Sequence, residues 1–402
     1  MWRANQALRS GVFARFDRGI WIITAVDLLT TASFSICIPF LSLYLYQERE
    51  LPMTLIGAVL LGAGIAGAIT QVIGGGLSDK FGRRPVILGT VGIRTVWFLV
   101  LAALIQVSAP IWAIVITYIT ARAAGSISRP MAAAIVADLS PKSRSAEAYG
   151  VLRVGRNVGW AAGPAIGGYL AIFLSYGWLF AVAAAISALA LCFIFFFFRE
   201  TFQGATDHVG LRSMVAVATD WGFLAFIGLS LLVFLGMGQL GSTLSVFTVE
   251  CIGISTAQYG LLLTTNGLLV IFFQYPVSRG INHLGKRRAL ILGAFLYGLG
   301  YIALSWALSF SWILVSIAII TLGEIVFSPT ALSVAGELSP TARRGHYMGF
   351  LGLSETLAIS IGPLVGGALL DAFTNDPLFI WGPIALLMFV AVLGFCLWMR
   401  RY

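Results

Sequence analysis

The sequence contains very little charge for its length. Of its 402 residues, 10% are charged and 59% are hydrophobic, whereas soluble proteins have about 25% charged and about 45–50% apolar residues. The apolar residues fall in blocks of about 20, the helix length that spans about 30 Å of hydrocarbon. This composition excludes a water-soluble enzyme and predicts a protein that crosses the lipid bilayer many times. The net charge of +9 is expected to face anionic lipid headgroups, so it does not indicate nucleic-acid binding.

Cysteine and histidine are also scarce. The four cysteines lie far apart, and the three histidines lie in short polar stretches. No Cys-x-x-Cys pair, Cys/His cluster, HExxH, DxxxD or Ser/His/Asp pattern occurs in the apolar blocks. The sequence therefore predicts no metal site, no disulfide framework and no cofactor. A membrane-embedded lipid-modifying enzyme, the alternative from another class of protein, has no catalytic pattern to support it.

Twelve apolar blocks separated by polar breaks predict twelve membrane-spanning helices. Their approximate limits are 19–46, 53–77, 85–108, 111–137, 146–174, 177–198, 220–249, 257–279, 288–308, 311–336, 345–371 and 378–399. Nineteen of the 25 lysines and arginines fall on one side of this arrangement, and Arg49 alone falls on the other. Because cytoplasmic loops carry the excess of Lys and Arg, both termini are predicted to be cytoplasmic, in a multi-pass plasma (inner) membrane protein.

The two halves of the sequence resemble each other. A shift of 199 residues aligns 130–144 with 329–343 and the Gly-Pro pair at 163–164 with that at 362–363. A single offset that holds over about 40 residues indicates a duplicated unit of six helices. The predicted domains are a six-helix bundle over 1–198, a cytoplasmic linker over 199–219 and a second six-helix bundle over 220–402. Repeated halves of this kind form a central site in many secondary transporters.

A short pattern follows the second predicted helix. Its residues are Gly75, Asp79, Lys80, Gly82, Arg83 and Arg84, in the order G-x-x-x-D-K-x-G-R-R. Asp79 stands at a helix end, where a carboxylate can pair with basic residues or with the positive N-terminus of a neighbouring helix. The second half has Asn282 in the place of Asp79. A basic turn that only determines topology is the alternative interpretation.

The fifth predicted helix carries regularly spaced small residues. They are Gly150, Gly159, Gly163, Pro164, Gly167 and Gly168. Three of these glycines recur every four residues, so they form a flat stripe against which another helix can pack closely. The proline removes a backbone hydrogen bond and predicts a kink. Ordinary packing of small residues is the alternative.

These two patterns resemble signatures of the major facilitator superfamily, and the resemblance covers essentially the whole chain. The first is similar to the loop signature of the superfamily, and the second matches the antiporter signature of its twelve-helix drug/proton-antiporter branch at all six positions. The resemblance implies an all-α membrane fold in which two six-helix repeats surround a central cavity. It also implies that Asp79 latches the cytoplasmic side in the outward-open state and that the bend of helix 5 helps to seal the pathway. The helix 4 arginine signature is only partly kept around Arg122, for which the family implies control of a nearby carboxylate's proton affinity.

Eight charged residues lie inside the predicted spans, away from the span ends. They are Arg94, Arg122, Arg129, Arg153 and Arg156 in the first half, with Asp27, and Glu324 and Glu355 in the second half. A charge at the bilayer centre costs at least about 2.5–3.5 kcal/mol, so such residues are functional by default. With a rise of about 1.5 Å per residue, Arg129, Arg153 and Arg156 reach the depth of Asp27. They are predicted to form a charge cluster with Asp27 or to extend toward lipid headgroups.

Glu324 is the leading candidate for proton exchange. It aligns with Gly125 in the repeat, so the duplicated frame requires no acid at this position. A helix 10 glutamate also resembles one found in some proton-coupled exporters of the family. Burial favours the protonated form of a carboxyl group, so a buried carboxylate can exchange protons near neutral pH. The same group can then bind either a proton or a cationic substrate. Asp27 and Glu355 are further candidates, and permanent pairing with an arginine is the alternative for each.

The predicted function is proton-coupled secondary transport, without a cofactor. The expected activity is an antiporter of the multidrug-efflux type that exports small hydrophobic or cationic amphipathic compounds by alternating access. Its expected partners are protons, a small-molecule substrate and the lipid bilayer, and a monomer is expected. The alternative in the same fold is a proton-coupled carrier of an anionic metabolite, a sugar or a lipid-linked glycan. The in-span charge of +2, with every carboxylate ionised, favours an anion.

Overall fold

The computed structural model describes residues 16–141, 144–201, 219–340 and 344–398, and it does not describe the side chains of residues 79, 145–146, 282 and 344–345. All regular secondary structure in this part of the chain is helical. The first half contains α2 (Arg18–Gln47), α3 (Met53–Phe81), α4 (Arg83–Gln106), α5 (Ile111–Ser126), α6 (Ser128–Leu139), α7 (Ser145–Phe173) and α8 (Tyr176–Phe197). The second half contains α10 (Trp221–Met237), α11 (Thr243–Val246), the π-helix η4 (Phe247–Cys251), α12 (Thr256–Leu284), α13 (Lys286–Leu304), α14 (Phe310–Leu338), α15 (Arg344–Ala372) and α16 (Pro377–Trp398).

The predicted membrane-spanning segments occur in the predicted order. Ten helices of the described residues are long and apolar enough to cross a membrane. The arginine-containing helix α7 and the segment from α10 to η4 complete the set of twelve segments. The fold class predicted from the sequence, an all-α membrane protein, is thus confirmed.

Two of the predicted helices are interrupted. The 111–137 span is present as Ile111–Leu139 with an interruption of one residue, whereas the prediction of one helix over 220–249 was wrong. The 111–137 segment divides at Ile127, between α5 and α6. The physical reason is Pro130, which has no N–H to donate to the carbonyl of Ser126. The 220–249 segment is interrupted at 238–242, between α10 and α11. Gly238 and Gly241 weaken the helix there, because glycine loses more backbone entropy than other residues when it becomes helical.

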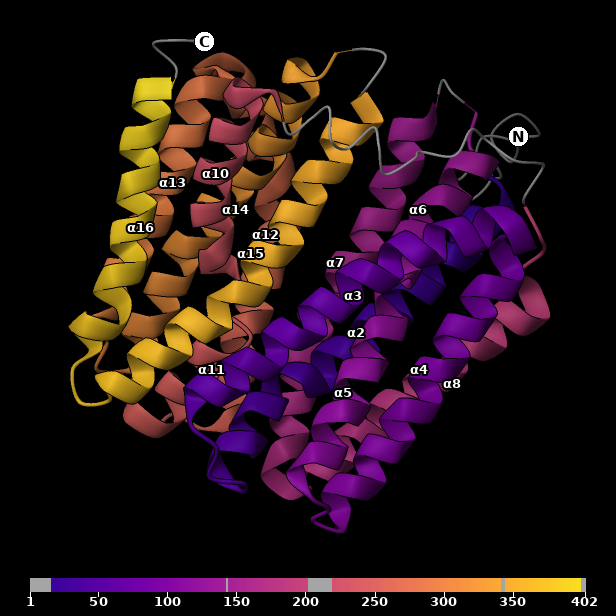
Figure 1. Cartoon of the computed structure of the whole chain (residues 1–402), viewed down its shortest axis with the longest axis horizontal. Helices are drawn as coiled ribbons and strands as arrows, with labels where there is room; N and C mark the ends of the chain where they lie inside the picture. Colours follow the sequence, from indigo (N-terminus) through magenta and orange to yellow (C-terminus); the bar gives the residue numbers. More distant parts are fainter. Residues whose placement is uncertain (1–15, 142–143, 202–218, 341–343, 399–402) are drawn as a thin grey trace, which may run out of the picture.

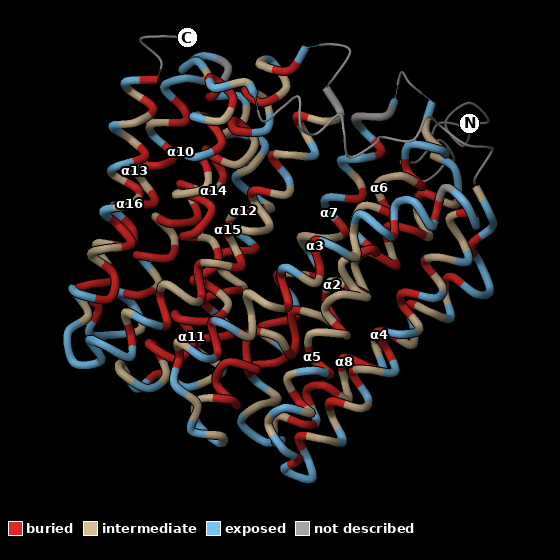
Figure 2. The backbone as a smooth tube through the Cα atoms, viewed as in Figure 1, coloured by how far each residue is buried: buried red, intermediate tan, exposed pale blue. Residues whose placement is uncertain are grey.

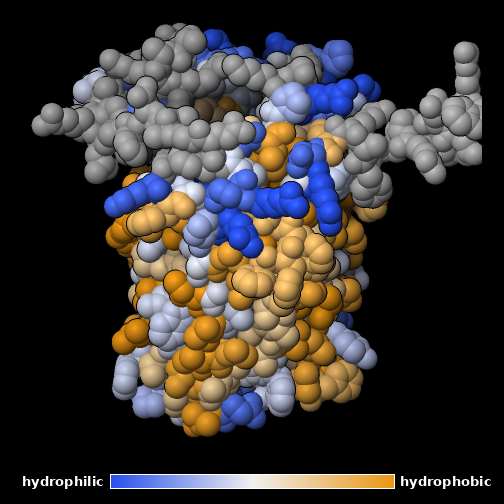
Figure 3. Space-filling view, turned by 90° about the vertical axis from the view of Figure 1, so that its right-hand side faces the viewer, coloured by the Kyte–Doolittle hydropathy of each residue, from blue (hydrophilic) through white to orange (hydrophobic). Residues whose placement is uncertain are grey.

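The helices form two groups, α2–α8 and α10–α16 (Figure 1). We call the side at which α2 begins and α16 ends the termini side. The two groups meet on the opposite side and diverge toward the termini side (Figure 1). Buried residues follow this arrangement, since they concentrate inside each group and where the groups meet (Figure 2). A space-filling view shows a broad hydrophobic surface bounded by hydrophilic side chains on the termini side (Figure 3), as expected for a surface that faces lipid.

The two halves contact each other mainly through two pairs of helices, α3 with α15 and α7 with α12. Both pairs involve glycine at positions aligned in the repeat. Gly168 of α7 lies against the first turn of α12 at Thr256, and Gly367 of α15 lies against the first turn of α3 at Met53. Because glycine has no side chain, the helix ends can approach each other closely. The contact between the halves on the side opposite the termini therefore uses positions that are repeated in the sequence.

The glycine stripe of α7 packs against α2, within the first half. A methyl group added at Gly159 would lie 3.1 Å from the backbone nitrogen of Ala32, and one added at Gly163 would overlap Ser35. Ser35 also donates its hydroxyl to the carbonyl of Gly159 at 3.0 Å. In contrast, a methyl group at Gly150 would meet open space. α7 continues through Pro164 as one helix from Ser145 to Phe173.

Candidate functional site

Glu324 lies on α14 and is partly buried. Its Oε2 accepts a hydrogen bond from Nδ2 of Asn266 on α12 at 3.0 Å. The same nitrogen donates to Oγ1 of Thr321 at 2.9 Å. Asn266 is only 3% exposed and Thr321 is fully buried. The Glu324 carboxylate is therefore held by an amide group, and no guanidinium pairs with it among the residues that the structure describes.

Other ionisable groups surround Glu324 at longer range. Arg153 of α7 and Glu355 of α15 act on it electrostatically, and so do Tyr297 and Tyr301 of α13. Tyr297 is fully buried, and its hydroxyl has no hydrogen-bond partner among the described residues. Glu324 and Glu355 of the sequence prediction therefore lie close enough to influence each other, and both influence Tyr297.

Arg153 connects the two halves near this region. Its Nη2 donates to Oε1 of Gln274 on α12 at 3.0 Å. The amide nitrogen of Gln274 donates to the carbonyl of Ile325, the residue after Glu324, at 3.2 Å. The structure does not bring Arg153 into direct contact with Asp27, because depth in the membrane does not specify which side of α7 a residue occupies.

Asp27 is paired with Arg156 of α7. Oδ2 of Asp27 lies 2.9 Å from both Nε and Nη2 of Arg156. The Asp27 side chain is 4% exposed and that of Arg156 is 24% exposed. Arg129 is exposed and acts on Asp27 only electrostatically. Among the three carboxylates predicted in the spans, Asp27 is the one whose charge is neutralised by a direct ion pair in the described structure.

Arg94 and Arg122 occupy the interior of the first half without a carboxylate partner among the described residues. Arg94 is 4% exposed and donates to Oγ of Ser187 at 3.3 Å. Arg122 is partly exposed, and its guanidinium lies 4.9 Å from the ring centroid of Phe34 on α2. This stacking on an aromatic face stabilises the arginine charge by a cation–π interaction.

The loop between α3 and α4 forms a network on the termini side. Gly82 has a φ of +93°, which favours glycine. Arg83 forms an ion pair with Asp138 of α6 at 3.1 Å. The carboxylate of Glu200 accepts the backbone N–H groups of Arg83 and Arg84 at 2.9 and 3.0 Å, so it caps the N-terminus of α4.

The other residues of the loop signature contribute less to this network. The ammonium group of Lys80 lies 5.2 Å from the ring centroid of Phe81. A methyl group at Gly75 would meet open space, so this glycine permits no close helix contact here. The side chain of Asp79 lies outside the described part of the structure.

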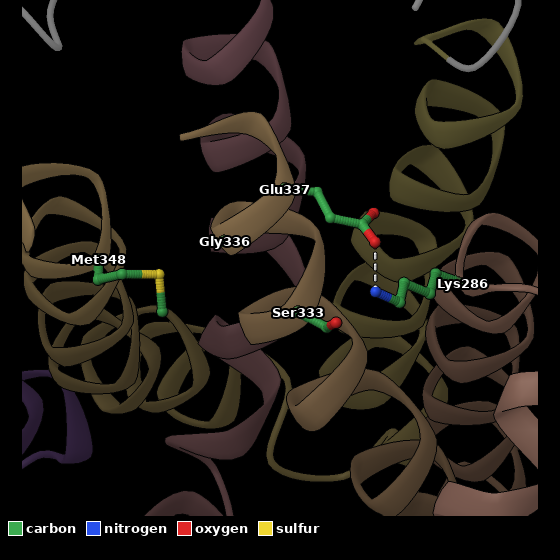
Figure 4. Close-up of a pocket in the computed structure, with 5 residues that line it drawn as sticks. All are labelled: Lys286, Ser333, Gly336, Glu337 and Met348. Carbon is green, nitrogen blue, oxygen red and sulfur yellow. Dashed lines mark hydrogen bonds and ion pairs between the residues drawn. The ribbon is translucent and has the colours of Figure 1, made fainter. Parts of the chain in front are cut away.

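The second half repeats this arrangement. Gly285 has a φ of +85°, and Lys286 after it forms an ion pair with Glu337 of α14. The pair lines a cavity of about 470 Å³ together with Ser333, Gly336 and Met348; Figure 4 shows the two charged side chains pointing toward each other. Glu337 is thirteen residues from Glu324, about 20 Å along α14. This cavity is therefore separate from the Glu324 region.

Two carboxylates connect the halves on the side opposite the termini. Asp371, at the end of α15, accepts the backbone N–H groups of Met53 and Thr54 at 2.8 and 2.7 Å and the hydroxyl of Thr54 at 2.6 Å. Asp371 thus caps α3 of the other half. Similarly, Glu250 of η4 accepts a hydrogen bond from the side-chain amide of Gln47.

Sequence reasoning missed Asn266 and Asp371. The signals available were an amide inside an apolar segment and an acid at the end of a predicted helix, and both are common in membrane proteins.

The described residues contain no group of three or more His, Cys, Asp or Glu side chains that could hold a metal ion.

Comparisons with known proteins agree on one family. The family model described as Major Facilitator Superfamily matches residues 23–250 and 226–402. The chain is 28% identical over 365 residues to the uncharacterized MFS-type transporter YttB of Bacillus subtilis, covering 89% of each chain. It is 25% identical to the Na(+), Li(+), K(+)/H(+) antiporter of Planococcus maritimus, covering 87% of this chain and 89% of the relative. It is 26% identical to the class C tetracycline resistance protein of Escherichia coli, covering 80% and 81%.

A solved structure shows the same fold. The crystal structure of a POT family transporter in complex with a thioalcohol-conjugated peptide has a TM-score of 0.81, with 95% of this chain and 96% of that chain covered. The sequence identity is 16%, so this similarity concerns the fold alone.

Proposed function

Because this chain belongs to the major facilitator superfamily and is thus a multi-pass membrane transporter rather than an enzyme, we propose that it is a proton-coupled antiporter. Its proposed substrates are small hydrophobic or cationic amphipathic compounds, which it exports by alternating access. Relatives named as a cation/H(+) antiporter and as a tetracycline resistance protein support this proposal. No cofactor is required, since the proton gradient supplies the driving force.

The observation that carries the proposal is the Glu324 carboxylate. It lies in a membrane helix, it is partly accessible, and its direct partner is the neutral amide of Asn266. A carboxylate in this position can bind a proton or a cationic substrate, but not both, because each neutralises the same charge. Competition for one group is sufficient to couple the entry of a proton to the exit of a cation.

The charge distribution supports an orientation for this cycle. The termini side carries the excess of basic residues, so we assign it to the cytoplasm and the protein to the plasma membrane. In the described state the two halves then contact each other toward the outside and diverge toward the cytoplasm (Figure 1). Residues 1–198 and 220–402 are the two units proposed to rock against each other, as one monomer. Most of the proposed linker, residues 202–218, lies outside the described residues.

Reconstitution of the purified protein in liposomes tests this function. With an imposed pH gradient, efflux of a fluorescent cationic dye such as ethidium should follow the gradient in the wild type. Glu324→Gln should reduce gradient-driven efflux to the level of protein-free liposomes, because glutamine cannot exchange a proton. Glu48→Gln is the control, since Glu48 is an exposed acid at the end of α2.

The assay tests the role of Glu324 separately from the proposed transport function. If the Glu324→Gln variant transports ethidium at the wild-type rate, Glu324 is not the coupling group. Asp27→Asn and Glu355→Gln then test the remaining carboxylates. If all three variants retain wild-type gradient-driven efflux, none of these carboxylates is the coupling group. Proton-coupled antiport itself is wrong if ethidium efflux by the wild type does not depend on the pH gradient.

A carrier of anions is the second candidate function. All five in-span arginines are in the first half, and Arg156 alone forms an ion pair with a carboxylate among the described residues. The unpaired guanidinium of Arg122 is partly exposed, as an anion site requires. If Arg122→Ala or Arg153→Ala abolishes binding of an anionic dye but not of ethidium, the anion carrier is favoured.

A further inference from the structure

Asn266 is the direct partner of the Glu324 carboxylate, and its amide orientation is defined by the hydrogen-bond network. The hydroxyl hydrogen of Thr321 is donated to the carbonyl of Ile317 at 2.7 Å. The Thr321 oxygen can therefore only accept from Asn266. An amide turned the other way would direct its oxygen at two acceptors, so Nδ2 must face Thr321 and Glu324.

Both hydrogens of this nitrogen are used. One is donated to Oγ1 of Thr321 and the other to Oε2 of Glu324. Oε2 accepts a hydrogen bond in this arrangement, and a carboxyl group accepts better through its carbonyl oxygen than through its hydroxyl oxygen. The arrangement therefore favours the proton of the neutral carboxyl group on Oε1. Asn266 and Thr321 are both buried, so the amide is held in this orientation away from solvent.

We propose that Asn266 is a positioning residue for proton exchange, which orients the Glu324 carboxyl group and reserves Oε1 for the transferred proton. This inference rests on the proposed function. The donor also stabilises the ionised form of Glu324, and so it determines the pH range over which a proton and a cationic substrate compete.

Titratable and charged groups on other helices act on the same carboxylate. α12, which packs against α14 and carries Asn266, also carries Arg279 and His283 toward its end on the termini side. α7 contributes Arg153 and α15 contributes Glu355. α13 contributes the hydroxyl groups of Tyr297 and Tyr301. α10 contains no ionisable side chain. Asn266 differs from all of these groups because it contacts the carboxylate directly and stays uncharged at every pH.

The test measures the pH dependence of ethidium binding by the purified protein and of its efflux from liposomes. Asn266→Leu removes the amide at similar volume. Without this donor the carboxyl group keeps its proton to higher pH, so the midpoint of ethidium binding should move by about one pH unit toward alkaline pH. Asn266→Gln retains an amide donor and should restore most of the wild-type midpoint.

Thr321→Val provides a second test that keeps Asn266 in place. It removes the acceptor that orients the amide, and it should shift the midpoint in the same direction by a smaller amount. This variant keeps the inference testable if Asn266→Leu does not fold. A purely structural role for Asn266 would lower the thermal stability of the variants without moving either midpoint.

The results distinguish the inference from the proposed function. If Asn266→Leu and Thr321→Val keep the wild-type midpoint while Glu324→Gln abolishes coupled efflux, the positioning role is wrong and the proposed function remains. If Glu324→Gln also retains coupled efflux, the proposed role of Glu324 fails together with the inference.

Discussion

Pairing distinguishes the carboxylates of the membrane interior more clearly than depth does. Asp27 contacts two nitrogens of Arg156, whereas Glu324 contacts one neutral amide. A buried ion pair is retained as a unit, because removal of one partner leaves the other charge unpaired in a medium that solvates it poorly. We therefore expect Asp27 and Arg156 to contribute mainly to the stability of the first half, and Glu324 to function.

The Asp27–Arg156 pair gives a prediction at the residue scale. Arg156→Met should destabilise the protein by about 3 kcal/mol, since it leaves Asp27 buried without a partner. The double variant Asp27→Asn, Arg156→Met removes both charges and should recover much of that loss. Unfolding of purified protein in detergent, followed by temperature or denaturant, measures both effects. Equal losses in the single and double variants would contradict the pairing argument.

The glycine stripe of α7 matters at the scale of the helix. Gly159 and Gly163 bring α7 against α2 so closely that a methyl group would contact the backbone or Ser35. Packing of this kind replaces the hydrophobic effect between helices, because lipid tails are as apolar as the side chains. Gly168, one position past the stripe, faces α12 instead. One helix thus contacts its own half along one face and the opposite half near its end.

Alanine substitutions along α7 test this arrangement. Gly159→Ala should reduce thermal stability, because the added methyl group forces α7 and α2 apart. Gly150→Ala is the matched control in the same helix, since its methyl group meets open space. It should be neutral or stabilise the protein by up to about 1 kcal/mol, the usual gain from glycine to alanine in a helix. If both variants lose stability equally, close packing at Gly159 is not the reason for the glycine.

The two sides of the whole molecule are held by different interactions. On the side opposite the termini, Asp371 of α15 accepts three hydrogen bonds from the first turn of α3. On the termini side, the ion pairs Arg83–Asp138 and Lys286–Glu337 each lie within one half. Closure of the opposite side in the described state therefore depends on contacts between halves, and Asp371 makes the most extensive of the polar ones.

Asp371→Ala is predicted to shift the molecule toward the state that is open on this side. Ser360 of α15 can report this opening, since its side chain packs against Gly64 of α3 and is only 8% exposed. In a protein with its native cysteines replaced, a Ser360→Cys side chain should react about tenfold faster with a membrane-impermeant thiol reagent when Asp371 is alanine. Asp376→Ala is the control, because the Asp376 carboxylate accepts a hydrogen bond from Leu378 in its own loop and contacts no group of the other half among the described residues. Unchanged labelling with Asp371→Ala would exclude a role for this carboxylate in closure.

The amino-acid sequence by itself determined the number, order and approximate limits of the membrane-spanning segments. The reason is that the hydrocarbon thickness imposes a length on every apolar block, and each block is local in the sequence. The sequence also located the ionisable residues of the spans, because a charge is conspicuous among apolar residues. Whether Glu324, Glu355 or Asp27 carries the proton stays a prediction.

Only the tertiary structure decided which of these residues meet. Depth placed Arg153 and Arg156 together near Asp27, but Arg156 alone pairs with it, while Arg153 bonds to Gln274 of the other half. Asn266 meets Glu324 across 58 positions, and Asp371 meets Met53 across 318. Such contacts depend on the rotation of each helix about its axis and on how the two halves dock. Those are properties of packing between distant segments, and no periodicity along a single segment encodes them.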